Sequence, residues 1–136
     1  IRLDDLIEMK NHFRLFDYCL DRIDEPLTKE MMKQMHKILK RGTTDEENPR
    51  CNVGGFKIIP NKIGLIEVVD TSSPKNVDRD IDNLLDEYNH LKKVSIEDII
   101  DFHYRFECIH PFGDENDTLV KNATYPQNAY KLRFSN

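Results

Sequence analysis

The residues best suited to chemistry in this chain gather at positions 109–117, which read Ile-His-Pro-Phe-Gly-Asp-Glu-Asn-Asp. An imidazole, His110, is followed by an acid, Asp114, and then by an amide, Asn116, two positions on. An imidazole takes up or releases a proton near neutral pH, and carboxylate oxygens are preferred by hard cations such as Mg²⁺. The stretch therefore holds the group types that proton transfer and metal binding use.

A second group of polar side chains lies just before this stretch. His103, Glu107 and His110 are four and three residues apart, so they share one face of a helix. They could form a metal site, although they do not make His-Glu-x-x-His and the ligand count for zinc is incomplete. The alternative is that His103 and Glu107 pack or are solvated beside the helix end. Cys108 is interpreted as a structural thiol.

The residues before His110 predict the helix that positions it. Ser95 and Asp98 make a capping box at its start, and Pro111 requires it to stop. Its expected buried positions are Ile96, Ile99, Ile100, Phe102, Phe106 and Ile109.

Three earlier segments also have helical periodicity. Residues 3–20 carry apolar side chains at three-to-four spacing, which predicts an amphipathic helix that ends before Pro26. Thr28 can cap a second helix that ends at Gly42, and Ser73 with Pro74 opens a third. The expected inner faces of these two helices are Met31, Met32, Met35, Ile38 and Leu39, and Val77, Ile81, Leu84, Leu85 and Tyr88.

The segments between the second and third helices have a different character. Residues 43–55 are polar and rich in turn formers, which predicts a loop. Residues 56–70 predict two short β segments around a turn at residues 60–62, and Pro60 and Gly64 suit an edge hairpin. The fold class is therefore mainly α with a short β-hairpin. Residues 122–136 show no helical period.

Bulk properties exclude several classes of protein. The chain has 136 residues and a net charge of −5, without the basic stripe that a nucleic-acid-binding surface needs. No run of eighteen apolar residues is present, so we expect no membrane span. Three widely spaced cysteines indicate reduced thiols in a cytoplasmic protein. The first residue is Ile1, from which we expect a trimmed piece of a longer protein.

The stretch around His110 resembles the signature of Fic-domain proteins, His-Pro-Phe-x-Asp/Glu-Gly-Asn-Gly/Lys-Arg-x-x-Arg. The order of elements from about residue 3 to residue 116 is also similar to that family. The similarity includes the residues Gly-Phe-Lys-Ile-Ile-Pro-Asn of the hairpin, a Ser-Pro helix and a long helix that runs into His-Pro-Phe. The resemblance implies a single Fic-like helical domain over residues 1–136 with a β-hairpin flap.

The resemblance also implies an activity, that of a protein adenylyltransferase. Such enzymes use ATP with Mg²⁺ and move AMP onto a Tyr, Thr or Ser hydroxyl of a target protein. His110 would be the base that takes the hydroxyl proton, and Asp114 would hold the Mg²⁺. Asn116, Gly113 and Phe112 would form the nucleotide-binding loop, with Asn116 donating to the α-phosphate and Phe112 fixing the loop in the core. The flap at residues 56–70 would dock the target segment as an added strand.

The chain departs from the family pattern after the acid of the motif. Glu115 and Asp117 stand where the family has small residues, usually glycine, whose backbone N–H groups form an anion nest. A left-handed conformation costs a residue such as Glu115 roughly 1–2 kcal/mol, and its carboxylate would repel phosphate. Thr118 and Lys121 replace arginines, and losing one such donor costs on the order of 10²–10³ in rate. The prediction is very poor ATP use.

Several alternatives stay open at this point. The family pattern is truncated or altered after about residue 117, either because this is a natural inactive copy or because an ordinary Fic domain has an altered end. The chain could also be a catalytically inactive protein-binding module. As some relatives do, it could use another nucleotide or a phosphocholine donor.

Overall fold

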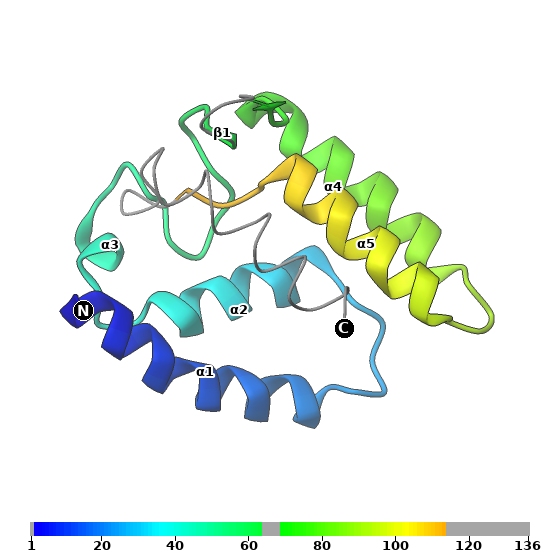
Figure 1. Cartoon of the computed structure of the whole chain (residues 1–136), viewed down its shortest axis with the longest axis horizontal. Coiled ribbons are helices and arrows are strands. Elements are labelled where there is room, and N and C mark those ends of the chain that lie inside the picture. The colour runs from blue at the N-terminus through cyan, green and yellow to red at the C-terminus, as the bar shows by residue number, and fades with distance from the viewer. Residues whose placement is uncertain (1, 64–68, 114–136) are drawn as a thin grey trace.

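The computed structural model of this chain describes residues 2–63 and 69–113, and shows a mainly helical molecule (Figure 1). One helix pair consists of α1 and α2, and a second of α4 and α5. Between them the chain forms a single turn of helix, α3, and a two-stranded antiparallel sheet. The elements are α1 (Leu3–Asp21), α2 (Lys29–Lys40), α3 (Thr44–Glu47), β1 (Lys62–Ile63), β2 (Val69–Asp70), α4 (Pro74–Asn89) and α5 (Ile96–Ile109).

The helix ends lie where the capping residues predict them. The Thr28 hydroxyl accepts a hydrogen bond from the N–H of Met31 at the start of α2, and Gly42 follows its end with a φ of +84°. Pro74 is the first residue of α4, and Ser95 and Asp98 form a complete capping box at the start of α5. Local side-chain chemistry therefore accounts for these boundaries.

The core lies where α4 and α5 meet α2. Its buried members are Met32, Val77, Ile81, Leu84, Leu85 and Ile109, and Leu27, Phe56, Phe102, Phe106 and Phe112 pack against it. This cluster draws on residues from position 27 to position 112, so the stretch after His110 is attached to the same core as the helices.

The hairpin exists, but its predicted position was wrong. Strand β1 pairs with β2 in the register Lys62↔Asp70 and Ile63↔Val69, and residues 56–61 are not a strand. Their polar groups bond elsewhere, since the N–H of Lys57 donates to the carbonyl oxygen of Pro111 at 2.8 Å. Pro60 has no N–H to offer to a ladder.

Helix α1 is confirmed, but its packed side carries the polar Asn11 together with half-buried residues such as Ile7 and Leu15. Asn11 is its one fully buried residue among those described, and its amide donates to the carbonyl oxygens of Leu39 and Arg41 at 2.8 and 2.9 Å. The apolar face is exposed instead. Its members are Leu3, Leu6, Met9, Phe13, Phe16 and Leu20.

Two smaller expectations were also wrong. The predicted loop at residues 43–55 contains the helical turn α3, whose Asp45 lies 3.3 Å from the buried ammonium of Lys40. In α5, Ile96 and Ile99 are exposed rather than buried, and the core begins further along the helix, at Phe102.

Candidate active site

Helix α5 delivers His110 to its own C-terminal end. His110 is the C-cap residue and adopts the left-handed conformation, with φ 48° and ψ 67°. Its N–H donates to the carbonyl oxygen of Phe106 at 2.9 Å, and its side chain is half-buried rather than enclosed in the apolar core. A left-handed conformation is uncommon for a residue other than glycine, and such residues cluster at functional sites.

Phe112 anchors the stretch that follows. Its ring stacks on the imidazole of His36, with the ring centroids 4.3 Å apart and the planes 15° from parallel. Tilted contacts join it to Phe56 at 5.6 Å and to Phe106 at 6.4 Å. These three contacts come from α2, the segment before β1 and α5, so they fix the chain direction after Pro111.

Gly113 approaches another backbone closely. A Cβ at this position would lie 2.9 Å from the carbonyl oxygen of Cys51 and 3.4 Å from its Cα. Real Cβ atoms essentially never come so near to a backbone atom, so only glycine fits without a shift. The stretch is thereby held between the core, through Phe112, and the loop that carries Cys51.

Lys57 connects this stretch to the base of the hairpin. Its ammonium donates to Asn61 Oδ1 at 2.6 Å, to Thr71 Oγ1 at 2.9 Å and to the carbonyl oxygen of Ile109 at 3.2 Å. The last acceptor is at the C-terminal end of α5, where the helix dipole favours a cation. The three bonds join the two sides of the hairpin base to the residue before His110.

The Lys57 ammonium is almost completely enclosed, with 2% of the residue exposed. Burial lowers its pKa from the ordinary 10.5 to about 8. Lys57 was not among the site residues expected from the sequence. The available signal was a lysine inside the apolar run Phe56–Ile59, because a charge within a buried segment is placed there only with polar partners.

The predicted site is only partly within the described residues. His110, Phe112 and Gly113 are adjacent to one another and to the Lys57 network, whereas Asp114 and Asn116 lie outside the described residues. Among the residues that are described, no three His, Cys, Asp or Glu side chains converge as a metal site would require. His103 and Glu107 lie 4.0 Å apart across one helical turn.

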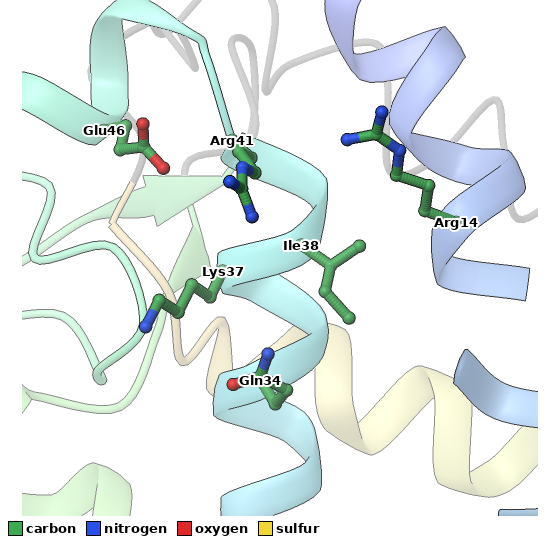
Figure 2. Close-up of a pocket in the computed structure, with 6 residues that line it drawn as sticks. All are labelled: Arg14, Gln34, Lys37, Ile38, Arg41 and Glu46. Carbon is green, nitrogen blue, oxygen red and sulfur yellow. The ribbon is translucent and has the colours of Figure 1, made fainter. Parts of the chain in front are cut away.

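A separate basic pocket opens between α1, α2 and α3. Figure 2 shows Gln34, Lys37 and Ile38 on α2, Arg41 just after it, Arg14 on α1 and Glu46 on α3. The pocket that they line has a volume of about 460 Å³. Its lining includes none of the predicted site residues, so it gives no support to the nucleotide site expected near His110.

Comparison with known proteins decides the family. The sequence model of the Fic/DOC family matches residues 26–120, which is well over half of the chain. The chain belongs to the Fic/DOC family. The matched segment runs from the residues just before α2, through the hairpin and α4, to the motif that begins at His110.

Solved structures of other Fic proteins have the same fold. A Fic-domain-containing signaling protein from Bacteroides thetaiotaomicron VPI-5482 is 25% identical, with a TM-score of 0.71, over 98% of this chain and 50% of its own. A Fic family protein from Desulfovibrio desulfuricans G20 is 23% identical, with a TM-score of 0.69, over 98% of this chain and 39% of its own. This Fic chain thus spans half or less of their length. No curated protein sequence matches it.

Proposed function

We propose that this Fic domain serves the transfer of AMP from ATP to a Tyr, Thr or Ser hydroxyl of a target protein, with His110 as the base. Proteins of the Fic/DOC family generally transfer a nucleoside monophosphate onto proteins. The observation that carries the proposal is the placement of His110, which is half-buried and left-handed at the end of α5, beside the tethered hairpin base.

In the proposed step, the imidazole of His110 accepts the proton of the target hydroxyl. The hydroxyl oxygen then forms a bond to the α-phosphorus, and the bond from that phosphorus to the pyrophosphate leaving group breaks. A base must be held within reach of the proton that it removes. The bond from the His110 N–H to Phe106 and the Lys57 bond to Ile109 both restrict the backbone on which the imidazole is mounted.

The neighbouring residues of the motif have supporting roles in this proposal. Phe112 and Gly113 fix the start of the nucleotide-binding loop, and Asn116 donates to the α-phosphate. Asp114 would hold Mg²⁺, because a carboxylate oxygen suits a hard cation. The bound ion would neutralise charge on the phosphates of ATP.

The hairpin is the proposed docking place for the target. The amide of Asn61, just before β1, donates to the carbonyl oxygen of Phe112 at 3.4 Å, and the Thr71 hydroxyl, just after β2, donates to the carbonyl oxygen of Asn61 at 2.7 Å. A target segment added along residues 56–70 would therefore lie beside the His110 turn. Main-chain bonds to such an edge supply affinity without requiring one target sequence.

The other properties of the protein are proposed on narrower grounds. Cys19, Cys51 and Cys108 are all free thiols, which supports a reducing, cytoplasmic setting. No helix in the described part of the chain has the length and apolarity for a bilayer span. We propose one domain over residues 1–136, with the family pattern altered after about residue 117.

The test is to restore the family residues and to measure nucleotide binding and transfer. Glu115→Gly, Asp117→Gly, Thr118→Arg and Lys121→Arg together should create ATP·Mg²⁺ binding that titration calorimetry detects, and AMP incorporation into protein. Adding His110→Ala to this variant should abolish incorporation and retain binding. If the restored variant neither binds ATP·Mg²⁺ nor transfers AMP, the proposal fails.

A second candidate function is favoured by the same departures from the motif. Glu115 and Asp117 place negative charge where phosphate would bind, so this copy could serve as an inactive protein-binding module that holds a partner segment along the hairpin. The unaltered chain would then bind no ATP·Mg²⁺ in calorimetry but would still bind its partner. Binding of another nucleotide or of a phosphocholine donor by the unaltered chain would instead indicate a different donor.

A further inference from the structure

An apolar stripe runs along the side of α1 that faces away from the other described elements. The fraction of each residue that is exposed to solvent is 46% for Leu6, 58% for Met9, 77% for Phe13, 62% for Phe16 and 48% for Leu20. We call these five residues, together with Ile23 just beyond the helix, the α1 stripe. In Figure 1, α1 forms the lower edge of the molecule, with α2 above it.

Within residues 2–63 and 69–113 the fold leaves the α1 stripe exposed, because α1 is attached to these residues through its opposite side. Three polar connections contribute to that attachment, beside half-buried side chains such as Ile7 and Leu15. Asn11 donates to the end of α2, Glu8 pairs with the buried Lys40 at 2.5 Å, and Asp4 accepts from Thr44. At 100° per residue, these positions point nearly opposite to Phe13 and Phe16.

The spacing of the stripe is that of a helix-pairing surface. Leu6, Met9, Phe13, Phe16 and Leu20 alternate steps of three and four residues, and Ile23 continues the pattern. A 3-4 repeat of this kind is the seam that one helix presents to another in a coiled coil. A surface helix that packs on its own core commonly carries a wider stripe, and that stripe faces the core.

We propose that the α1 stripe is a two-fold interface at which a second copy of this chain docks, with the two α1 helices antiparallel. In the register that places Phe13 opposite the partner's Phe16, Met9 lies opposite the partner's Leu20. Each layer then occurs twice, as a two-fold interface requires.

Charges beside the stripe agree with this occupant. Lys10 and Asp17 lie on the same flank, and neither forms an ion pair within the described residues. The antiparallel register places Lys10 opposite the partner's Asp17, and the two-fold axis repeats the pair. A parallel arrangement would instead direct Lys10 to the partner's Asp5, which already lies 4.0 Å from Arg2 in its own chain.

The exposed area is also of the right size. Six large apolar side chains exposed to this degree offer on the order of 600–700 Å² per copy. A standard interface buries about 800 Å² per partner, and the flanking charged residues supply the remainder. Exposed apolar patches of this extent on soluble proteins are commonly contact surfaces.

The test is sedimentation velocity of the chain over a series of concentrations. The wild type should be a dimer whose melting temperature rises with protein concentration. Phe13→Glu should be a monomer with unchanged helix content and a melting temperature that does not depend on concentration, because Phe13 makes little contact within one chain. Ile96→Glu is a matched control, since Ile96 is 72% exposed on α5 and lies outside the stripe. This variant should remain a dimer.

A charge exchange then identifies the occupant. Lys10→Asp and Asp17→Lys should each raise the dimer dissociation constant about tenfold, and the two substitutions together should restore it. A wild type that is monomeric at every concentration would overturn the proposal, and so would a Phe13→Glu dimer. Failure of the double exchange to restore dimerisation would overturn the antiparallel pairing with a second copy.

Discussion

Replacing Lys57 with Met tests whether a buried ammonium holds the hairpin base to α5, even though burial disfavours its charged form. The substitution keeps the apolar stem and removes the ammonium that bonds to Asn61, Thr71 and the carbonyl oxygen of Ile109. All three acceptors are neutral oxygens. The contribution of the ammonium to the free energy of unfolding is therefore a balance between its hydrogen bonds and its loss of contact with water.

The two sides of that balance can be compared. Hydrogen bonds from a charged donor contribute roughly 1.5–3 kcal/mol each. The fall in the pKa of Lys57 from 10.5 to about 8 corresponds to roughly 3 kcal/mol against the charged form. The lowered pKa shows that, for the charged form, the loss of water outweighs these bonds. Lys57→Met, however, also leaves three acceptor oxygens without their donor, at roughly 1–3 kcal/mol each. Their sum exceeds the penalty that is released with the charge, so Lys57→Met should lower the free energy of unfolding by about 2–4 kcal/mol at pH 7.

The loss should grow with pH. Because the folded-state pKa of Lys57 lies below the unfolded-state value, the unfolded chain binds more protons between about pH 8 and 10.5. The free energy of unfolding of the wild type therefore rises with pH across that window, whereas Lys57→Met has no such group. The difference between the two proteins should increase by roughly 3 kcal/mol from pH 8 to pH 10.5.

Urea denaturation at several pH values measures this difference directly. Lys62→Met is the matched control, because the Lys62 side chain is 59% exposed in the neighbouring strand. It should change the free energy of unfolding by less than about 0.5 kcal/mol at each pH. A difference for Lys57→Met that stays constant or falls as pH rises would refute the reasoning.

Three further substitutions test other contacts by thermal or urea denaturation. Gly113→Ala should cost about 1–3 kcal/mol, since its Cβ would lie 2.9 Å from Cys51 O, and an unchanged melting temperature would contradict that close approach. Asn11→Ala should lower the free energy of unfolding by about 2–3 kcal/mol, because two bonds to carbonyl oxygens are lost. Asn83 is exposed on α4, so the control Asn83→Ala should leave the free energy of unfolding unchanged. Lys40→Met should cost about 3–5 kcal/mol by leaving two carboxylates without their buried cation, and a neutral result would show that the ion pairs add nothing.

Local signals in the sequence predicted most of the fold. Thr28, Pro74 and the Ser95–Asp98 box define helix starts through bonds within a few residues, so no tertiary information is needed to read them. The family motif likewise identified the end of α5 and the place of His110. The roles of His110, Phe112 and Gly113 in catalysis and binding stay predictions, as do those of Asp114 and Asn116.

What the sequence could not predict depends on long-range contacts. Residues 56–61 have the composition of a strand, but Lys57 and Asn61 bond to the motif more than fifty positions away. The periodicity of α1 identified a helix with an apolar side, yet periodicity does not state which side a neighbour covers. Asn11 and Glu8 determined the packing there, because their polar groups find buried partners on and near α2.

The buried polar bonds that hold α1 to the end of α2 have a thermodynamic consequence. Separation of α1 would break these bonds and would also expose the half-buried side chains of Ile7 and Leu15, so this opening should have its own dependence on urea and on ionic strength. Amide protons of α1 would then exchange through a subglobal opening rather than with the unfolding of the whole chain. Helix α1 would then behave as a cooperative unit of its own.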